Sequence, residues 1–257
     1  MGSKSKTAST SINYDTVAPA YVDYRVADAR IDAAIRRHIV PGETVLNVGA
    51  GQGSYEPQDC DVTAIEPSRE MIARRSVTRV KALQGSAEHL PFDDYSFDTS
   101  LAILTIHHWQ DVQKGLRELK RVTRGKVIIV TWNGDYGDFW LPDYLPEIAR
   151  IDVELFPSVN QLSEWLGPKT NAEVLEIPFD CTDGFMCAYW RRPEMYLIPA
   201  ARRSISTFSR VGDISRGLNR LREDIQSGHW HKQYESLLRK TSLDCGYRLV
   251  VHEKSAV

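Results

Sequence analysis

Residues 44–68 constrain the fold of this chain more than any other stretch, because two short apolar runs enclose a cluster of glycines. The first run, residues 45–48, is nearly continuous, which is typical of a strand buried on both faces of a parallel sheet. Three glycines follow at alternate positions: Gly49, Gly51 and Gly53. The second run, residues 62–65, ends at Glu66. We therefore predict strand, turn and strand in an open α/β sheet, with a ligand at the carboxyl ends of the strands.

The spacing of these glycines distinguishes two kinds of cofactor site. A dinucleotide fingerprint, G-x-G-x-x-G, needs a glycine at position 54, where this chain has Ser54. The observed pattern, G-x-G-x-G, resembles motif I of the class I S-adenosylmethionine (SAM) methyltransferases. That resemblance implies that the glycines make room for the methionine part of SAM and that Glu66 accepts hydrogen bonds from both ribose hydroxyls.

Two further segments resemble the same family. Residues 84–92, QGSAEHLPF, are similar to its G-D-A-E-x-L-P-F segment, with Ser86 in place of the usual aspartate. Residues 14–25 resemble its Y-D-x-x-A-x-x-Y…R lead-in. Over residues 44–132 the motifs follow in family order, and the chain is similar to the UbiE-like, small-molecule (type 11) methyltransferases.

The resemblance implies an α/β fold with a doubly wound, mostly parallel seven-stranded sheet, the Rossmann-like methyltransferase fold, and a helical cap insertion. It implies SAM as cofactor, S-adenosylhomocysteine as product, and no metal. The residues that we expect to bind the cofactor are Tyr14, Arg25, Gly49, Ala50, Gly51, Gly53, Glu66, Pro67, Met71, Ser86, Ala87 and Leu104.

Two histidines follow the predicted fourth strand, residues 97–104, where the loop borders the ligand cleft. His107 and His108 are our candidates for a catalytic base, since an imidazole near its reference pKa takes up a proton at neutral pH. Their structural alternative is packing under the adjacent tryptophan and capping of the next helix. Asp135 and Tyr136, after the predicted fifth strand, are further candidates.

The domain organisation follows from the order of the predicted elements. We expect a flexible tail at 1–11, a SAM-binding core with an N-terminal lid at 12–132, and completion of the sheet at 133–257. A helical substrate cap is expected at about 185–240, entered by a strand or extended segment at 185–190. Only seven residues separate Gly53 from Asp61, too few for the usual crossover helix of about ten or more residues.

Composition narrows the function classes. A net charge of -2 provides no general basic field for nucleic acid, and no apolar run approaches the ~20 residues of a membrane span. Four cysteines without metal-ligand spacing indicate reduced thiols in a cytoplasmic protein. We predict a SAM-dependent methyltransferase that acts on a small-molecule acceptor, with secondary metabolism as a candidate role. The oligomeric state is left open. A SAM-binding regulator and a nucleotide-cofactor oxidoreductase on the same framework are the alternatives.

Overall fold

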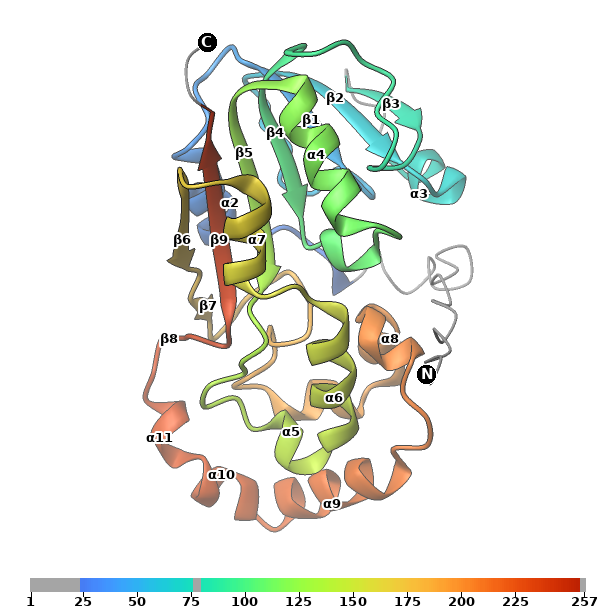
Figure 1. Ribbon diagram of the computed structural model, residues 1–257. Coiled ribbons are helices and arrows are strands. Elements are labelled where there is room, and N and C mark those ends of the chain that lie inside the picture. The colour runs from blue at the N-terminus through green and yellow to red at the C-terminus, as the bar shows by residue number, and fades with distance from the viewer. Residues whose placement is uncertain (1–23, 76–79, 255–257) are drawn as a thin grey trace, which may run out of the picture.

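The computed structural model describes residues 24–75 and 80–254, so the predicted tail at 1–11 and Tyr14 lie outside the described residues. Its centre is a seven-stranded sheet in the order β3-β2-β1-β4-β5-β9-β6 (Figure 1). The strands are β1 (Thr44–Val48), β2 (Asp61–Glu66), β3 (Lys81–Gln84), β4 (Phe97–Ile103), β5 (Thr123–Trp132), β6 (Thr170–Val174) and β9 (Tyr247–Glu253). The pairs among β1 to β5 are parallel, and β9 is antiparallel to both β5 and β6. The predicted mostly parallel, doubly wound sheet is confirmed.

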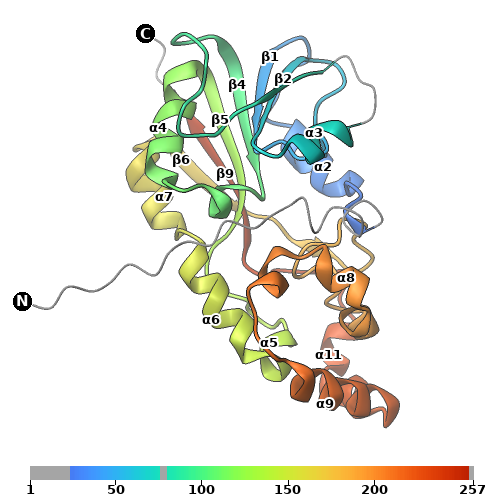
Figure 2. The ribbon, with the colours of Figure 1, turned by 90° about the vertical axis from the view of Figure 1, so that its right-hand side faces the viewer.

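Helices cover both faces of the sheet because consecutive residues of its central strands are apolar, so that both faces are buried. Val127 and Ile129 of β5 belong to one buried cluster, with α4 (Val112–Val122) and α7 (Val159–Leu166). Ile128 and Val130 belong to the other, with α2 (Ala29–Arg36). Figures 1 and 2 show α4 and α7 on one side of the sheet and α2 on the other. The continuous apolar run of β5 thus serves two cores at once.

Side-chain caps fix where these helices begin. The Asp111 carboxylate accepts a hydrogen bond from the backbone N–H of Lys114 at 2.9 Å, at the start of α4. Ser68 accepts one from Met71 N at 3.2 Å, at the start of α3 (Arg69–Ala73). Ser and Asp are residue types favoured at this position, and each satisfies a backbone donor that the first helical turn leaves without a partner.

The connection from β1 to β2 contains no helix in residues 49–60, as its length predicts. An ion pair braces it instead. Arg75, just after α3, donates to both oxygens of Glu56 at 2.7 and 2.5 Å and to the carbonyl of Gly51 at 3.1 Å. Asn47 Nδ2 also donates to Glu56, at 3.0 Å. The side chains of Arg75 and Glu56 are only 6% and 8% exposed, so this pair is part of the interior.

A helical lobe lies beyond the carboxyl ends of β4 and β5 (Figures 1 and 2). It contains α5 (Leu141–Tyr144), α6 (Pro146–Leu155), η2 (Pro193–Leu197), α8 (Pro199–Arg203), η3 (Ser206–Ser209), α9 (Ser215–Gln226), α10 (His229–Gln233) and α11 (Glu235–Leu238). A two-stranded sheet of β7 (Ile177–Pro178) and β8 (Ser242–Leu243) lies where the lobe meets the main sheet. The lobe thus includes the predicted helical region and also α5 and α6, which come earlier in the chain.

The predicted strand or extended segment at 185–190 was wrong, because these residues form consecutive turns. Local hydrogen bonds hold them, from Ala188 N to Phe185 O at 3.0 Å and from Trp190 N to Cys187 O at 3.2 Å. All six side chains are buried. A short, fully apolar run shows that a segment is buried, but its pattern does not distinguish a strand from a compact turn.

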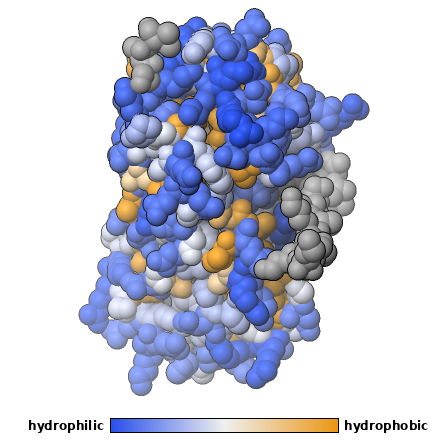
Figure 3. Space-filling model, viewed as in Figure 1, coloured by the Kyte–Doolittle hydropathy of each residue, from blue (hydrophilic) through white to orange (hydrophobic). Residues whose placement is uncertain are grey.

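The surface is mainly polar. Figure 3 shows a largely hydrophilic face, with hydrophobic residues gathered near the middle, where the sheet meets the lobe. Among the described residues no helix combines the length and apolar character needed to cross a bilayer. All four cysteines are buried free thiols.

Candidate functional site

A cavity of about 910 Å³ lies at the carboxyl ends of β1, β2, β3 and β4. It brings together most of the residues predicted to bind a cofactor or to act in catalysis: Arg25, Gly49, Ala50, Gly51, Glu66, Pro67, Met71, Ser86, Ala87, Leu104, His107 and His108. Gly53 does not line it; its backbone, with φ +92°, turns beside the Glu56–Arg75 pair. The volume falls in the range of cofactor and ligand sites, ~300–1,000 Å³.

The glycine turn after β1 needs residues without side chains. Gly49 has φ +69°, and a Cβ there would lie 1.9 Å from Thr105 Oγ1. Gly51 has φ +51°, and a Cβ there would meet nothing within 4 Å, although the residue lines the cavity. The first glycine therefore allows the loops after β1 and β4 to touch, and the second keeps backbone open to a ligand.

Glu66 is buried at the end of β2 and faces the same cavity. One oxygen accepts a hydrogen bond from Gly51 N at 2.8 Å and the other from Ser68 N at 2.9 Å. Burial raises the pKa of this carboxyl, while the two N–H donors oppose that shift. A carboxylate offers about four acceptor positions, so two remain for hydroxyl donors. This arrangement fits the ribose of SAM.

A second carboxylate ties the loops after β3 and β4 together. Glu88 is buried and accepts hydrogen bonds from Gln110 N at 2.8 Å and from Asp111 N at 3.2 Å. Ser86 and Ala87, just before it, line the cavity. The loop that carries the predicted cofactor-binding residues Ser86 and Ala87 is therefore fixed to the loop that carries His107 and His108.

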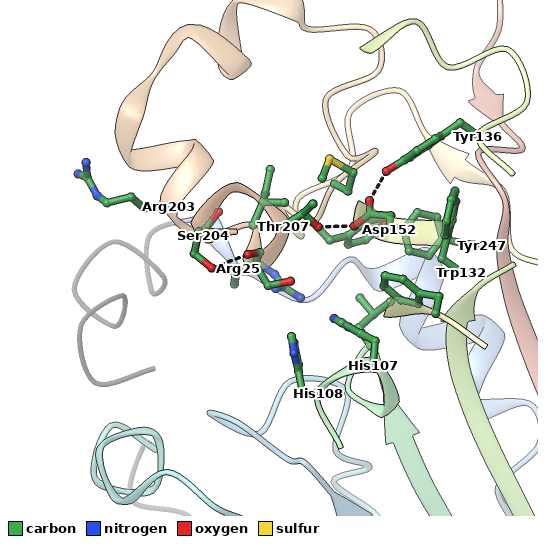
Figure 4. A pocket seen from close by; sticks show the side chains of 17 residues that line it. Arg25, His107, His108, Trp132, Tyr136, Asp152, Arg203, Ser204, Thr207 and Tyr247 are labelled. Atoms are coloured by element: carbon green, nitrogen blue, oxygen red, sulfur yellow. Dashed lines mark hydrogen bonds between the residues drawn. The ribbon is translucent and has the colours of Figure 1, made fainter. Parts of the chain in front are cut away.

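A smaller pocket of about 50 Å³ adjoins this cavity on the side of the helical lobe. Four residues line both spaces: Arg25, Leu104, His107 and His108. The other walls of the small pocket are mainly aromatic and hydroxyl-bearing: Trp132, Tyr136, Phe156, Phe185, Tyr247, Ser204 and Thr207 among them. Figure 4 shows the two histidines on the side of β4, facing Ser204 and Thr207 of the lobe.

The two histidine rings lie against each other, with centroids 3.8 Å apart. Nδ1 of His107 is buried and has no hydrogen-bond partner among the residues that the structure describes. Burial, and then the neighbouring His108, Arg210 and Arg25, hold the pKa of His107 well below its usual value. Burial and the same two arginines lower the pKa of His108 to about 3. Both imidazoles are therefore neutral at pH 7.

The small pocket also contains a buried acid that the sequence did not reveal. Asp152, on α6, accepts a hydrogen bond from Thr207 Oγ1 at 2.5 Å and another from the hydroxyl of Tyr136. Burial raises its pKa to about 6. Tyr136 thus lies in the wall, as one of our further candidates, whereas Asp135 turns away and accepts a hydrogen bond from Gly137 N at 2.8 Å.

Arg25 was expected to bind the cofactor, and in the structure its guanidinium forms an ion pair with Asp183. Its Nε donates to Asp183 at 2.5 Å, and the Tyr55 hydroxyl donates to the same carboxylate at 2.9 Å. Asp183 is 1% exposed, so these contacts are part of the interior. The N-terminal segment, the glycine loop and the second half of the chain therefore meet at one buried acid.

Several wall residues were missed by the sequence analysis: Tyr55, Asp152, Thr207 and Arg210. They come from three separate segments, namely the connection after β1, α6, and η3 with its C-cap residue, and no motif connects these segments. These residues are related only by their positions in the folded chain, which the sequence does not display. Among the described residues no group of three or more histidine, cysteine or acidic side chains is arranged to hold a metal ion.

Comparison with known proteins agrees with this geometry. A family model described as a methyltransferase domain matches residues 46–131. The chain is 30% identical over 134 residues to an uncharacterized methyltransferase of Bacillus subtilis, covering 47% of this chain and 53% of that protein. It is 28% identical over 188 residues to a demethylmenaquinone methyltransferase of Renibacterium salmoninarum, covering 60% and 79% respectively. The chain thus spans about half the length of some curated relatives.

A solved structure resembles the whole chain more closely. The crystal structure of a putative methyltransferase from an antibiotic biosynthesis pathway of Anabaena variabilis superposes with a TM-score of 0.83 and 32% identity. The match covers 90% of this chain and 99% of that one, so it includes the helical lobe as well as the sheet. The chain therefore belongs to the S-adenosylmethionine-dependent methyltransferase family.

Proposed function

We propose that this protein transfers a methyl group from SAM to a small-molecule acceptor, in secondary metabolism. The observation that carries the proposal is the junction of two spaces. The 910 Å³ cavity is lined by the glycine turn and Glu66, and the 50 Å³ pocket adjoins it at His107 and His108. The antibiotic-pathway assignment of the Anabaena variabilis relative supports the metabolic role.

In this proposal the larger cavity holds the cofactor. Glu66 accepts hydrogen bonds from the ribose hydroxyls, and the backbone at Gly49, Ala50 and Gly51 lies along the methionine part. Arg25, held in place by Asp183, borders the cofactor. The loop residues Pro67, Met71, Ser86 and Ala87 enclose the adenine, and Leu104 separates the two spaces. We also assign Tyr14 and Gly53 to this site from sequence, the former as part of a lid and the latter as part of the turn.

SAM supplies a methyl group on a positively charged sulfur, and the protein must align an acceptor with it and exclude water. The methyl–sulfur bond breaks as the bond from the methyl group to the acceptor atom forms, and a proton on that atom passes to solvent or to an imidazole. His107 and His108 lie between the two spaces, and as neutral imidazoles they can each accept a hydrogen bond from that atom. Full protonation of His108 at pH 7 would cost about 5 kcal/mol, since its pKa is about 3. We therefore assign them chiefly to orienting the acceptor, and keep the general-base role as the alternative.

Two other functions remain as alternatives. A SAM-binding regulator would bind the cofactor without turnover, and a nicotinamide-dependent oxidoreductase would bind a dinucleotide. The absence of a glycine at position 54 disfavours the dinucleotide. The small pocket beside the cofactor cavity favours an enzyme over a regulator, because it provides a place for a second reactant.

One experiment tests the proposal in two steps. Calorimetric titration of the full chain with S-adenosylhomocysteine and, separately, with NAD identifies the cofactor class. A screen of phenols, amines and carboxylic acids with methyl-labelled SAM then measures transfer. We expect binding of S-adenosylhomocysteine but not NAD, and labelled product from at least one acceptor. Binding of NAD alone would overturn the proposal, and tight SAM binding without any transfer would favour the regulator.

A further inference from the structure

Asp152 is a buried carboxylate that forms no ion pair within the described part of the chain, although the charge of Arg210, which lines the cofactor cavity, acts on it from a distance. Its residue is 3% exposed, and the side chain lines the small pocket. Its two hydrogen bonds come from neutral hydroxyls, those of Thr207 and Tyr136. No lysine, arginine or histidine forms an ion pair with it in the described ranges. A buried carboxylate without a direct ion-pair partner is costly, and a cationic ligand in this pocket would lower that cost.

The position of Asp152 indicates which end of an acceptor it meets. His107 and His108 line both the cofactor cavity and the small pocket, whereas Asp152 lines the small pocket alone. Figure 4 shows Asp152 on the lobe side, with Thr207 between it and Ser204. The methyl group arrives from the cofactor side. The atom that receives it therefore lies near the histidines, and the remote end of the acceptor lies near Asp152.

The walls around this acid are aromatic. Trp132, Phe156 and Tyr247 line the same pocket, and the face of an aromatic ring attracts a cation. Two arginines also line this pocket, and the charge of each is offset by a different means. Arg25 is paired with Asp183, and Arg203 is exposed, where solvent screens its charge. A carboxylate among aromatic faces is the chemistry that recognises an ammonium group.

We propose that Asp152 binds a protonated amine at the end of the acceptor remote from the methyl-accepting atom, with the aromatic walls around it. The inference rests on the proposed function, because it assigns a substrate class to the same site. The acceptor is thus a small amphiphile with a cationic amine at one end and a nucleophilic oxygen or nitrogen at the other. Tyr136 and Thr207 are positioning residues, since they orient the carboxylate without needing to touch the ligand.

Two phenols that differ only in their remote group test this inference. Tyramine has an ammonium group, and tyrosol has a neutral hydroxyl on the same two-carbon arm. Affinity for each is measured by calorimetry on the full chain saturated with S-adenosylhomocysteine. We expect the wild-type protein to bind tyramine about tenfold or more tightly than tyrosol, because charge-assisted hydrogen bonds are the stronger ones. Equal affinities, tighter binding of tyrosol, or no binding of tyramine overturns the inference.

The variant Asp152→Asn keeps the shape of the side chain and removes its charge. We expect it to lose about tenfold or more in affinity for tyramine and less than about threefold for tyrosol. Asp224→Asn is the matched control, because Asp224 accepts a hydrogen bond from Tyr144 at 2.8 Å in the lobe and lines neither space. It should change neither affinity.

Binding of S-adenosylhomocysteine separates the two levels of the argument. If wild-type protein binds it but shows no preference for tyramine, this inference fails and the proposed function stands. If wild-type protein does not bind S-adenosylhomocysteine, the proposed function fails, and this inference fails with it. Equal losses for S-adenosylhomocysteine, tyramine and tyrosol in Asp152→Asn would assign Asp152 a structural role and overturn the inference. The wild-type comparison needs no variant, so it decides the matter even if Asp152→Asn does not fold.

Discussion

The imidazole of His107 stacks on the phenyl ring of Phe156, with ring centroids 4.1 Å apart and planes inclined by 25°. The two residues come from different parts of the molecule. His107 lies in the 3-10 helix η1 (Ile106–His108) after β4, and Phe156 caps the end of α6 in the lobe. The orientation of the imidazole at the methyl-transfer junction therefore depends on the lobe as well as on the sheet.

Replacing this ring by an aliphatic side chain should affect turnover more than cofactor binding. We expect Phe156→Leu to lower kcat roughly 10- to 100-fold, because a misplaced group at the reacting centre costs about that much. The affinity for S-adenosylhomocysteine should stay within about twofold. Phe179→Leu, at a ring that is 36% exposed and lines neither space, is the control. Unchanged turnover in Phe156→Leu would show that the stack does not orient His107.

Removing the acid at the end of β2 should strongly weaken cofactor binding. We expect Glu66→Ala to weaken the affinity for S-adenosylhomocysteine by about 100-fold, through loss of charge-assisted hydrogen bonds to two hydroxyls. Calorimetry measures the affinity, and a thermal melt verifies that the variant is folded. Glu70→Ala removes a nearby acid that pairs with Arg74 on α3, and it should bind normally. Wild-type affinity in Glu66→Ala would refute the ribose contact.

Substitution by alanine should have different effects at two glycines of the same turn. Gly49→Ala should destabilise the fold by about 3 kcal/mol or more, because the new Cβ meets Thr105 and the backbone is left-handed. Gly51→Ala should cost only about 1 kcal/mol, the left-handed strain alone, since its Cβ would enter open space. In Gly51→Ala the added Cβ should instead weaken the affinity for the cofactor. Denaturant melts and calorimetry distinguish the two effects, and equal destabilisation would contradict this assignment.

The buried Arg75–Glu56 pair should be costly to break on one side only. Arg75→Met leaves Glu56 as an uncompensated charge, which should destabilise the protein by about 3–5 kcal/mol. The double variant Arg75→Met/Glu56→Gln removes both charges and should recover most of that loss. Urea unfolding of the wild type, both single variants and the double variant gives the coupling energy. Additive losses would mean that the pair does not act as a unit.

Asp152 should give stability an unusual dependence on pH. Its pKa is about 6 in the folded chain against a reference value of 3.8, so the folded state retains a proton that the unfolded chain has lost. Stability from this group is therefore present below about pH 4 and is lost as pH rises through 6, by up to about 3 kcal/mol. The groups that act on it are Tyr136, Thr207 and the more distant Arg210.

The measurement is the difference in unfolding free energy between Asp152→Asn and wild type at several pH values. The difference should shift in favour of the variant between pH 4 and pH 7, because the variant has no carboxylate to ionise. Other groups, such as Asp28 and Asp98, titrate in both proteins and cancel. A difference that does not change with pH would contradict the raised pKa.

Sequence reasoning succeeded where neighbouring residues determine the structure. The glycine turn and Glu66 lie within residues 44–68, and one apolar run, one turn and a second run specify them together. The missing crossover helix was predictable from length alone. The caps at Ser68 and Asp111 were predictable because a capping side chain bonds a backbone donor only two or three residues away.

The acceptor side was not predictable in the same way. Asp152 and Thr207 are 55 residues apart, and each belongs to a segment whose pattern shows only that it is helical or buried. The turns at 185–190 were mistaken for a strand for the same reason. Pocket walls made from distant segments depend on how the lobe packs on the sheet, and no local periodicity encodes that packing.

The short connection between β1 and β2 has a consequence for how products leave. Because no helix intervenes, Tyr55 from that connection reaches Asp183, which also binds Arg25 beside both spaces. One carboxylate therefore joins the rim of the cofactor cavity to the wall of the acceptor pocket. We expect the departure of S-adenosylhomocysteine and of the methylated product to be kinetically linked, with loosening of this single junction permitting both.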